Sequence, residues 1–406
     1  MIKITSMSCK EGILKKLVKI IGIMVVLGIG IVLTTMKVQD SKKPIQEYLA
    51  EDLVGESQEI PEENNNQASK ILSTNDTKDE INANSNDIKV SSSEINTNTT
   101  EIEVSANGIE DNTNRLNNAR DQNTNNETIE DESVAVAAAL NITNPSIEID
   151  ASSAILLDGK TGKVLYYKNA TTEIYPASTT KLMTALVALD LCDVSEEVVI
   201  GSEINSIASD ASRAYLVEGQ RLTLQMLLEA MLVPSGNDAA YAIAAYVGRK
   251  SLQDNKADVK VAVQEFIRLM NEKNALLRLL DTNFKNPDGY DEEGQHTTAY
   301  DMGIIAIEAL KNDTISTISR KAHARNVLLS GEDVTWNSSN KLIVSGSGMY
   351  YKYAIGLKTG TSSLAGRCLI SAAEKDDCTY VSVVMNSSAV GRWEDSIALL
   401  EYGINE

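Results

Sequence analysis

Histidine is scarce in this chain, with only His296 and His323 among 406 residues. That scarcity argues against a Ser–His–Asp triad, which needs a histidine as general base, and against a histidine-rich metal site. Cysteine is also rare, and the spacing of its four copies matches no zinc pattern. Asp and Glu outnumber Lys and Arg by 57 to 37, so the formal net charge is −20. Such an acidic chain is a poor partner for nucleic acid, whose phosphates need clustered basic side chains.

Aromatic residues are few as well, and they gather in one part of the chain. Both Trp, both Phe and every Tyr except Tyr48 follow residue 160. Because aromatic side chains bury large apolar areas, the part able to build a core is residues 150–406. The sequence therefore predicts one globular domain at 150–406, preceded by segments of a different kind.

The N-terminal region carries one long apolar run, from Ile20 to Met36. At about 17 residues it lies at the lower limit for a membrane-spanning helix. Five lysines precede the run, so the positive-inside rule keeps residues 1–19 in the cytoplasm and exports the rest of the chain. A cleaved signal peptide is the alternative, but no A-x-A-like site comes after the run. We expect a transmembrane anchor (or uncleaved signal) at 20–36, a single-pass location in the cell membrane and an extracellular C-terminal domain.

Residues 37–149 are rich in Asn, Ser, Thr, Asp and Glu, which indicates a polar linker. Within it, a large aliphatic residue recurs at every seventh position, at Ile81, Ile88, Ile95, Ile102, Ile109 and Leu116. This heptad pattern is typical of a coiled coil, so a stalk at 81–116 that makes the chain a homo-oligomer is one hypothesis. A disordered tether is the other, because Gly108 and the many Asn, Ser and Thr weaken an isolated helix.

After residue 150 the predicted elements change from strands to helices and back to strands. SAILLD and KVLYYK predict a hairpin, helical patterns run from Ser178 to about residue 310, strands return in the last 60 residues or so, and WEDSIALLEYGI predicts a final helix. Strands from both ends that enclose a helical middle predict an α+β domain with one mixed sheet packed by helices. Cys368 and Cys378 flank a predicted hairpin turn, where free thiols are favoured over a disulfide.

The first candidate catalytic pair is Ser178 and Lys181, in the segment YPASTTKLMTALVALD. Ser178 lies at the start of a helical pattern, where unpaired backbone N–H groups favour negative charge. Lys181 comes three residues later, so both side chains share one helix face. A neutral amine there could take the serine proton if burial and a neighbouring cation lower its pKa. The plain alternative is a helix cap with a solvated lysine after it, and Ser338 to Lys341 repeats the spacing.

The second candidate is Ser235-Gly236-Asn237, on a predicted turn after Pro234. A hydroxyl and an amide two residues apart could relay a proton and hold a substrate carbonyl. A turn leading into a helix cap uses the same residue types, so this motif is a weak signal when it is taken alone.

The third candidate is Lys358-Thr359-Gly360, on the predicted strand YAIGLKTGTS. A lysine and hydroxyls along a strand edge could bind a carboxylate, and a glycine would let a substrate backbone approach closely. Lys160-Thr161-Gly162 repeats the triplet in a predicted hairpin turn, where turn chemistry accounts for it.

The combination of the three motifs is more specific than any one of them. Ser-x-x-Lys, Ser-x-Asn and Lys-Thr-Gly occur in that order, at a helix start, an inter-helix turn and a strand, and this set resembles the penicillin-recognising serine enzymes. From about Ser152 to Tyr402 the chain is similar to the low-molecular-mass D-alanyl-D-alanine carboxypeptidases, through YPASTTKLMTALVALD, LVPSGNDAAYAIAAYVG, FKNPDGYDEEGQHTTAYDM, NSSNKL and GLKTGTS. The resemblance implies a β-lactamase/DD-peptidase-like fold, with an antiparallel sheet flanked by helices and a helical subdomain.

The resemblance also implies roles for the motif residues. Ser178 would be acylated by a peptidoglycan stem peptide, or by a β-lactam as covalent inhibitor, with Lys181 as general base. Ser235 would pass a proton to the leaving D-alanine, while Asn237 would orient the scissile amide. No metal or cofactor is implied.

The strand motif would bind the other end of the substrate. Lys358 and Thr359 would help to bind its terminal carboxylate, and Gly360 would keep the strand edge open. Thr361 would supply one backbone N–H of the oxyanion hole, and Ser178 the other.

Two alternatives remain from different classes. A class A-like β-lactamase would need a glutamate that activates water, for which Glu272 is a candidate, although NEKNALL predicts a helix there. A non-hydrolytic sensor module that binds penicillin or the cell wall would not need the intact Ser178 and Lys181. One departure from the family pattern is Gln295-His296, where a His-Tyr pair is common, and we expect His296 to be structural.

Overall fold

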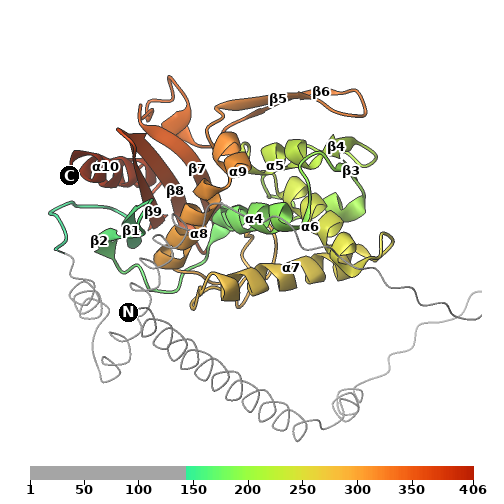
Figure 1. Cartoon of the computed structure of the whole chain (residues 1–406), viewed down its shortest axis with the longest axis horizontal. Helices are drawn as coiled ribbons and strands as arrows, with labels where there is room; N and C mark the ends of the chain where they lie inside the picture. Colours follow the sequence, from blue (N-terminus) through green and yellow to red (C-terminus); the bar gives the residue numbers. More distant parts are fainter. Residues whose placement is uncertain (1–142) are drawn as a thin grey trace, which may run out of the picture. The chain divides into compact units, whose positions relative to one another are not determined.

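The computed structural model describes residues 143–406 (Figure 1). The expected cytoplasmic segment 1–19, anchor 20–36 and heptad segment 81–116 lie outside the described residues, as does most of the linker 37–149. Between residues 143 and 406, no helix has the length and apolar composition to cross a bilayer.

Secondary structure follows the predicted order of strands, helices and strands, except that two short strands, at 197–199 and 221–223, interrupt the helical part. The strands are β1 Ser153–Asp158, β2 Val164–Lys168, β3 Glu197–Val199, β4 Arg221–Thr223, β5 His323–Val327, β6 Asp333–Asn337, β7 Ala354–Ser362, β8 Gly366–Lys375 and β9 Cys378–Ser387. The α-helices are α4 Lys181–Leu191, α5 Leu224–Leu232, α6 Asn237–Leu252, α7 Val259–Leu276, α8 Ala299–Lys311, α9 Asp313–Ser319 and α10 Gly391–Asn405. Residues 143–406 also contain three 3-10 helices: η2 Ala177–Thr180, η3 Ser202–Ser206 and η4 Lys341–Ile343.

The central sheet joins the two ends of the described chain. Its five strands lie in the order β2-β1-β9-β8-β7, and every neighbouring pair is antiparallel. The mixed sheet expected from the strand pattern is therefore wrong, and the antiparallel sheet that the family resemblance implies is confirmed. The early strand β1 therefore lies beside the late strand β9 in Figure 1, with Ile155 opposite Val383. Strand β7 is an edge strand of this sheet, which leaves one side of its backbone for other contacts.

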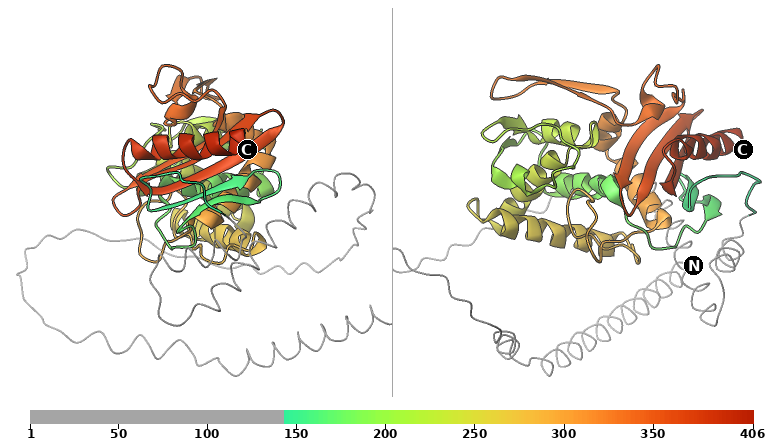
Figure 2. Two further views of the ribbon diagram at one scale, coloured as in Figure 1. Left: turned by 90° about the vertical axis from the view of Figure 1, so that its left-hand side faces the viewer. Right: turned by 180° about the vertical axis from the view of Figure 1, so that it is seen from behind.

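Both faces of the sheet are covered, because its side chains alternate between two apolar cores. Ile155 and Leu157 of β1 belong to the larger core, which the sheet shares with the helices α4 to α9. Ala154 and Leu156 of the same strand belong to the second core, with Trp393 of α10. Figure 2 shows α10 on the outer face of the sheet and the other helices on the opposite side. The predicted α+β fold is confirmed.

Helix α4 runs through the middle of the helical part, which explains its composition. Every residue from Lys181 to Ala188 is buried, so the helix is apolar on all sides apart from Lys181 and Thr184. Helix α6 packs against α4, α5 and α7. The small residues along α6, such as Ala239, Ala240 and Ala244, are buried in that packing. A buried polar side chain on α4 must therefore find its partners inside the protein.

The predicted hairpin turns are present at both ends of the domain. Asp376 and Asp377, which connect β8 to β9, have positive φ angles of 50° and 63°, as a two-residue hairpin turn requires. Lys160 to Gly162 form the turn between β1 and β2, with Gly162 at φ 71°. Among the described cysteines, Cys192, Cys368 and Cys378 are all free thiols, as favoured from the sequence.

Candidate active site

The Ser178 hydroxyl is presented by a tight turn in front of α4. Ser178 lies in the 3-10 helix η2, whereas the sequence predicted it at the start of an α-helix, and Lys181 is the first residue of α4. Ala177 before it has a φ of +47°, an uncommon conformation for a residue with a Cβ. Thr179 fixes the turn, because its Oγ1 donates to the Pro176 carbonyl at 2.6 Å. Ser178 itself remains half-buried, so a substrate can reach it.

Lys181 contacts Ser178 directly and has no exposed surface. Its Nζ donates to Ser178 Oγ at 2.8 Å, to Asn237 Oδ1 at 2.9 Å and to the Asp288 carbonyl at 2.8 Å. Burial lowers the pKa of Lys181 to about 8, against the opposing pull of the Asp288 and Asp238 carboxylates. A substantial fraction of the amine is therefore neutral near physiological pH, and a neutral amine can accept the Ser178 proton.

Ser235 and Asn237 come from the turn between α5 and α6, as predicted. Ser235 has a φ of +70°, and Gly236 comes next, where an added Cβ would lie 2.7 Å from the Ala230 carbonyl oxygen. Asn237 is then the first residue of α6, and its backbone N–H donates to the Ser212 carbonyl at 2.8 Å. This strained turn directs the amide of Asn237 to Lys181.

Lys358 carries a second buried amine to the site from β7. Its Nζ donates to Ser235 Oγ at 2.8 Å and to the Thr359 carbonyl at 2.9 Å. Burial and the nearby cations of Lys181 and Arg392 hold the pKa of Lys358 well below its usual range. The Ser-x-Asn motif therefore contacts both of the other motifs. Lys181 of Ser-x-x-Lys contacts Asn237, and Lys358 of Lys-Thr-Gly contacts Ser235.

Gly360 and Thr361 continue β7 past the nucleophile turn, which is the turn 177–180 that carries Ser178. A Cβ on Gly360 would lie 3.1 Å from the Cys368 Cβ and 3.2 Å from the Ala177 Cβ, so a side chain at this position would crowd the turn. Arg392, near the start of α10, donates to the Gly360 carbonyl at 3.2 Å and to Thr361 Oγ1 at 3.1 Å. Two basic residues, Lys358 and Arg392, therefore flank the strand edge where a carboxylate could bind.

Three further residues of this site were not singled out from the sequence. The buried Asp288 accepts a hydrogen bond from Asn237 Nδ2 at 2.5 Å, Ser339 Oγ lies 2.7 Å from Thr359 Oγ1, and Arg392 contacts Thr361. Asp288 and Ser339 stand within the segments FKNPDGYDEEGQHTTAYDM and NSSNKL. The sequence did not show that these residues meet the three motifs, because each contact joins residues at least 20 positions apart.

The repeated motifs and the alternative glutamate do not form a second site of this kind. Lys160-Thr161-Gly162 is a surface turn, and Lys341 of the second Ser-x-x-Lys is exposed. Glu272 lies on α7, where it is exposed and forms an ion pair with Arg268. The structure therefore gives no support for a β-lactamase glutamate at residue 272. His296 contacts the Gly294 carbonyl and pairs with Asn283 through its backbone, as expected of a structural residue.

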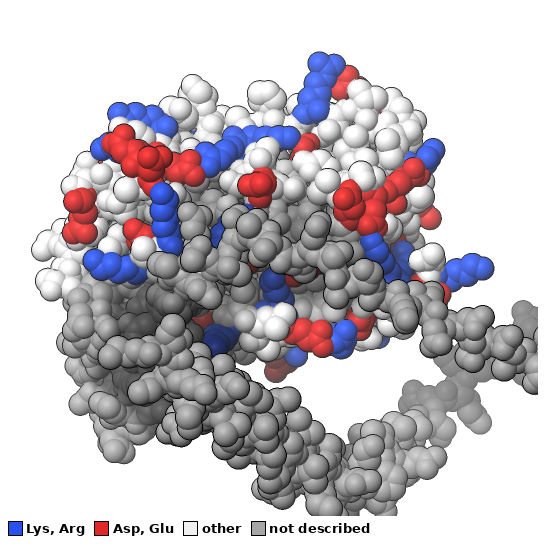
Figure 3. Space-filling view, in the orientation of Figure 1, with Lys and Arg blue, Asp and Glu red and all other residues white. Residues whose placement is uncertain are grey.

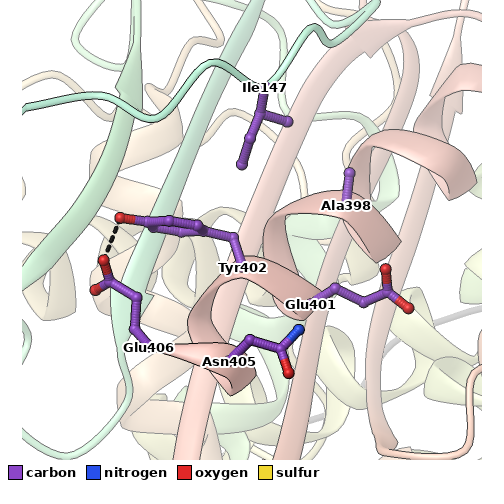
Figure 4. Close-up of a pocket in the computed structure, with 6 residues that line it drawn as sticks. All are labelled: Ile147, Ala398, Glu401, Tyr402, Asn405 and Glu406. Atoms are coloured by element: carbon purple, nitrogen blue, oxygen red, sulfur yellow. Dashed lines mark hydrogen bonds between the residues drawn. The ribbon is translucent and has the colours of Figure 1, made fainter.

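A shallow pocket opens at the C-terminal end of α10 and contains none of the motif residues (Figure 4). It is lined by Ile147, Ala398, Glu401, Tyr402, Asn405 and Glu406. On the uncovered part of the face shown in Figure 3, Lys and Arg lie among Asp and Glu, and no large patch of one sign appears there. No group of three or more metal-ligating side chains occurs among residues 143–406. The serine–lysine cluster is therefore the candidate active site.

Comparison with known proteins places the chain among relatives of one family. Residues 138–389 match the family model described as D-alanyl-D-alanine carboxypeptidase. The chain is 32% identical over 244 residues to D-alanyl-D-alanine carboxypeptidase DacF of Bacillus subtilis (strain 168), which covers 59% of this chain and 58% of DacF. It is 32% identical over 272 residues to the D-alanyl-D-alanine carboxypeptidase of Streptomyces sp. (strain K15), which covers 64% of this chain and 89% of that protein.

The fold gives the same result. The crystal structure of the Streptomyces K15 DD-transpeptidase superposes with a TM-score of 0.59 at 32% identity, over 65% of this chain and all of the other. The chain spans somewhat more than half the length of DacF, the first of these relatives. The matched residues include the whole serine–lysine cluster except Arg392, and this chain belongs to the D-alanyl-D-alanine carboxypeptidase family.

Proposed function

We propose that this chain is a serine-type D-Ala-D-Ala carboxypeptidase that removes the terminal D-alanine from peptidoglycan stem peptides. The observation that carries the proposal is the 2.8 Å contact between Ser178 Oγ and the fully buried Nζ of Lys181. A serine becomes a nucleophile when an adjacent base accepts its proton, and Lys181 is the one basic group that the described residues bring to Ser178.

Acylation proceeds by attack of Ser178 Oγ on the carbonyl of the penultimate D-alanine. Neutral Lys181 accepts the Ser178 proton as the new C–O bond forms. The backbone N–H groups of Ser178 and Thr361 would stabilise the oxyanion, and Asn237 would orient the scissile amide. Ser235, held by Lys358, lies where it can pass a proton to the leaving D-alanine nitrogen as the C–N bond breaks.

Substrate orientation would depend on the carboxylate that ends the peptide. Lys358, Thr359 and Arg392 present donors along β7, and Arg392 has a further buried N–H without a partner among the described residues. A carboxylate bound there would lie one residue away from the scissile bond, as a carboxypeptidase requires. Water then attacks the acyl-enzyme carbonyl and releases the shortened peptide, with Ser178 reprotonated.

The cellular setting is inferred from the sequence and belongs to the same proposal. An anchor at 20–36 would hold the catalytic domain on the outer side of the cell membrane, where peptidoglycan lies. A β-lactam would acylate Ser178 in place of the peptide and inhibit the enzyme.

The test is D-alanine release from a diacyl-L-Lys-D-Ala-D-Ala peptide by the full-length protein. We expect release by the wild type and none above background by Ser178→Ala, because the nucleophile is lost while its turn is kept by Thr179. Ser195→Ala, in an exposed turn, is the matched control and should retain full activity. A Ser178→Ala protein that is still labelled by penicillin would place the nucleophile elsewhere.

Transpeptidation is a second candidate, since a relative of known structure is named a DD-transpeptidase. Water and an acceptor amine compete for the same acyl-enzyme. The ratio of aminolysis to hydrolysis, measured with an added D-amino acid or peptide amine, separates the two functions.

A further inference from the structure

A buried carboxylate lies behind the catalytic pair, and the proposed reaction does not use it. Asp288 is 1% exposed. Its Oδ2 accepts from Asn237 Nδ2 at 2.5 Å, and its Oδ1 accepts from the Tyr290 backbone N–H at 3.1 Å. Burial raises the pKa of Asp288, whereas the two hydrogen bonds and Lys181 favour the ionised form. A carboxylate that is removed from water in this way needs a reason beyond stability, because burial of a charge is costly.

The contact with Asn237 fixes which way its amide faces. Asn237 Oδ1 accepts from Lys181 Nζ, and Nδ2 donates to Asp288. If the amide turned over, its NH₂ would face the Lys181 amine and its oxygen would face the carboxylate, which are two repulsive contacts. The second hydrogen of Nδ2 remains available to a substrate carbonyl. A neutral acceptor at 288 would impose this orientation less strongly, because hydrogen bonds to a charged group are the stronger ones.

The loop that carries Asp288 is held rigidly on several sides. Thr184 of α4 donates to the Pro287 carbonyl at 2.6 Å, and Lys181 donates to the carbonyl of Asp288 itself. Gln295, 1% exposed, donates through Nε2 to the Tyr290 carbonyl at 2.8 Å and accepts from the Lys285 N–H at 3.1 Å. These contacts set the position of the carboxylate relative to α4 and leave it little freedom to relax.

We propose that Asp288 is a positioning residue, whose carboxylate orients the Asn237 amide for both Lys181 and the substrate. The inference rests on the proposed function, since it concerns the same acylation. The Asp288 carboxylate contacts no reacting atom, since its partners are Asn237 Nδ2 and the Tyr290 N–H, so the side chain acts only through Asn237 and through its charge.

The charge has a consequence that a purely structural role would lack. Lys181 faces Asp238 and Asn237 from α6, Asp288 from the loop and the basic Lys358 from β7. The Asp288 anion raises the pKa of Lys181 and so opposes the effect of burial. Replacement by neutral asparagine should lower that pKa, so the neutral base would be present at lower pH.

The experiment compares full-length wild type with Asp288→Asn. The second-order rate constant for acylation by benzylpenicillin is measured from about pH 6 to pH 10, beside thermal unfolding of each protein. For Asp288→Asn we expect the acid limb of the profile to move to lower pH by about one unit. The plateau should fall about 10- to 100-fold, because a hydrogen bond to a charged group no longer orients Asn237.

Two further variants make the test specific. Asp291→Asn removes a carboxylate from the same loop that accepts from Leu364 N–H and not from Asn237, and it should keep the wild-type profile. Asp288→Ala removes the acceptor as well, and should show the same shift of the acid limb with a lower plateau. It also serves if Asp288→Asn does not fold, because alanine places no amide hydrogen against the Tyr290 N–H.

The outcomes distinguish this inference from the proposed function. A wild type that is neither acylated nor releases D-alanine would overturn both. An acylated wild type whose profile is matched within about twofold by folded Asp288 variants would overturn the role of Asp288 alone.

Discussion

Ser178 and Ser235 each contact a different buried lysine. Lys181 and Lys358 are among the largest fully buried side chains of residues 143–406, and they contact Ser178 and Ser235 respectively. A buried ammonium is costly unless it is hydrogen-bonded, so both are held by carbonyl and hydroxyl oxygens. The same burial makes the neutral form accessible, which a solvated lysine does not allow near neutral pH.

The pH dependence of acylation depends on Lys181. Since burial lowers its pKa to about 8, the fraction of neutral amine increases as pH rises through that value. The rate of acylation by benzylpenicillin should therefore rise about tenfold per pH unit below about 8 and level off above it. Lys181→Arg should lower the plateau by at least about 100-fold, because a guanidinium stays charged and cannot accept the proton.

A Lys181→Arg protein that is acylated at the wild-type rate would contradict the role of the amine. Lys160→Arg, at the surface copy of the lysine triplet, provides the control for the substitution and should change nothing.

The site residues that the sequence could predict are those that stand in short motifs. Ser178 with Lys181, and Ser235 with Asn237, lie so close in sequence that their spacing predicts that each pair of side chains is close in space. Asp288 carries no such spacing, because it meets Asn237 across 51 residues. Arg392 likewise reaches Thr361 from another element, 31 residues away. Such contacts arise from the packing of elements, and a single sequence does not show which ones meet.

At the scale of elements, the nucleophile turn and the Asp288 loop fit together without space to spare. Gly289 has a φ of +82°, and a Cβ there would lie 1.8 Å from the Ala177 carbonyl oxygen. Ala177 is itself at positive φ directly before Ser178. Where Gly289 packs against Ala177, the chain forms the 3-10 helix η2 and not the first turn of the predicted α-helix. Helical periodicity locates Lys181 on α4 but does not reveal the turn, which depends on the loop packed against it.

Gly289→Ala tests this fit. The new methyl meets backbone that cannot move without displacing Ser178, so we expect a loss of several kcal/mol of unfolding free energy and of most acylation. Gly294→Ala is the matched control, because Gly294 also has a positive φ, of +79°, but its Cβ would meet only the flexible end of Lys285. It should cost about 1 kcal/mol and leave acylation intact.

Chemical denaturation and penicillin labelling measure the two effects. Equal losses in the two variants would mean that the φ angle, and not contact with the nucleophile turn, sets the requirement for glycine at 289.

At the scale of the whole molecule, the strand–helix–strand order was predictable because hydrophobic alternation and helical periodicity are local signals. The pairing of β1 with β9 was suggested only by strands at both ends of the domain. The heptad segment 81–116 stays a prediction, as does the anchor 20–36, since neither lies among the described residues.

Sedimentation of an isolated 70–125 segment tests the heptad segment. Association is expected if Ile81, Ile88 and the later heptad residues form the core of a coiled coil. A helix with one large aliphatic residue in every seven can bury those residues only against a second chain. A monomer at micromolar concentration would instead indicate a tether. Circular dichroism of the same sample shows whether association is accompanied by helix.

The pairing of β1 with β9 also bears on how the protein is made. The ribosome releases β1 long before β9, because the helices α4 to α9 lie between the two strands in the sequence. Until then β1 has only β2 as a partner, and a two-stranded hairpin is marginally stable. Long-range pairing of this kind slows folding, because the large loop between the strands must close first. The central sheet therefore cannot be completed until β9 has been synthesised, and we expect the closure of β1 against β9 to be a late step of folding.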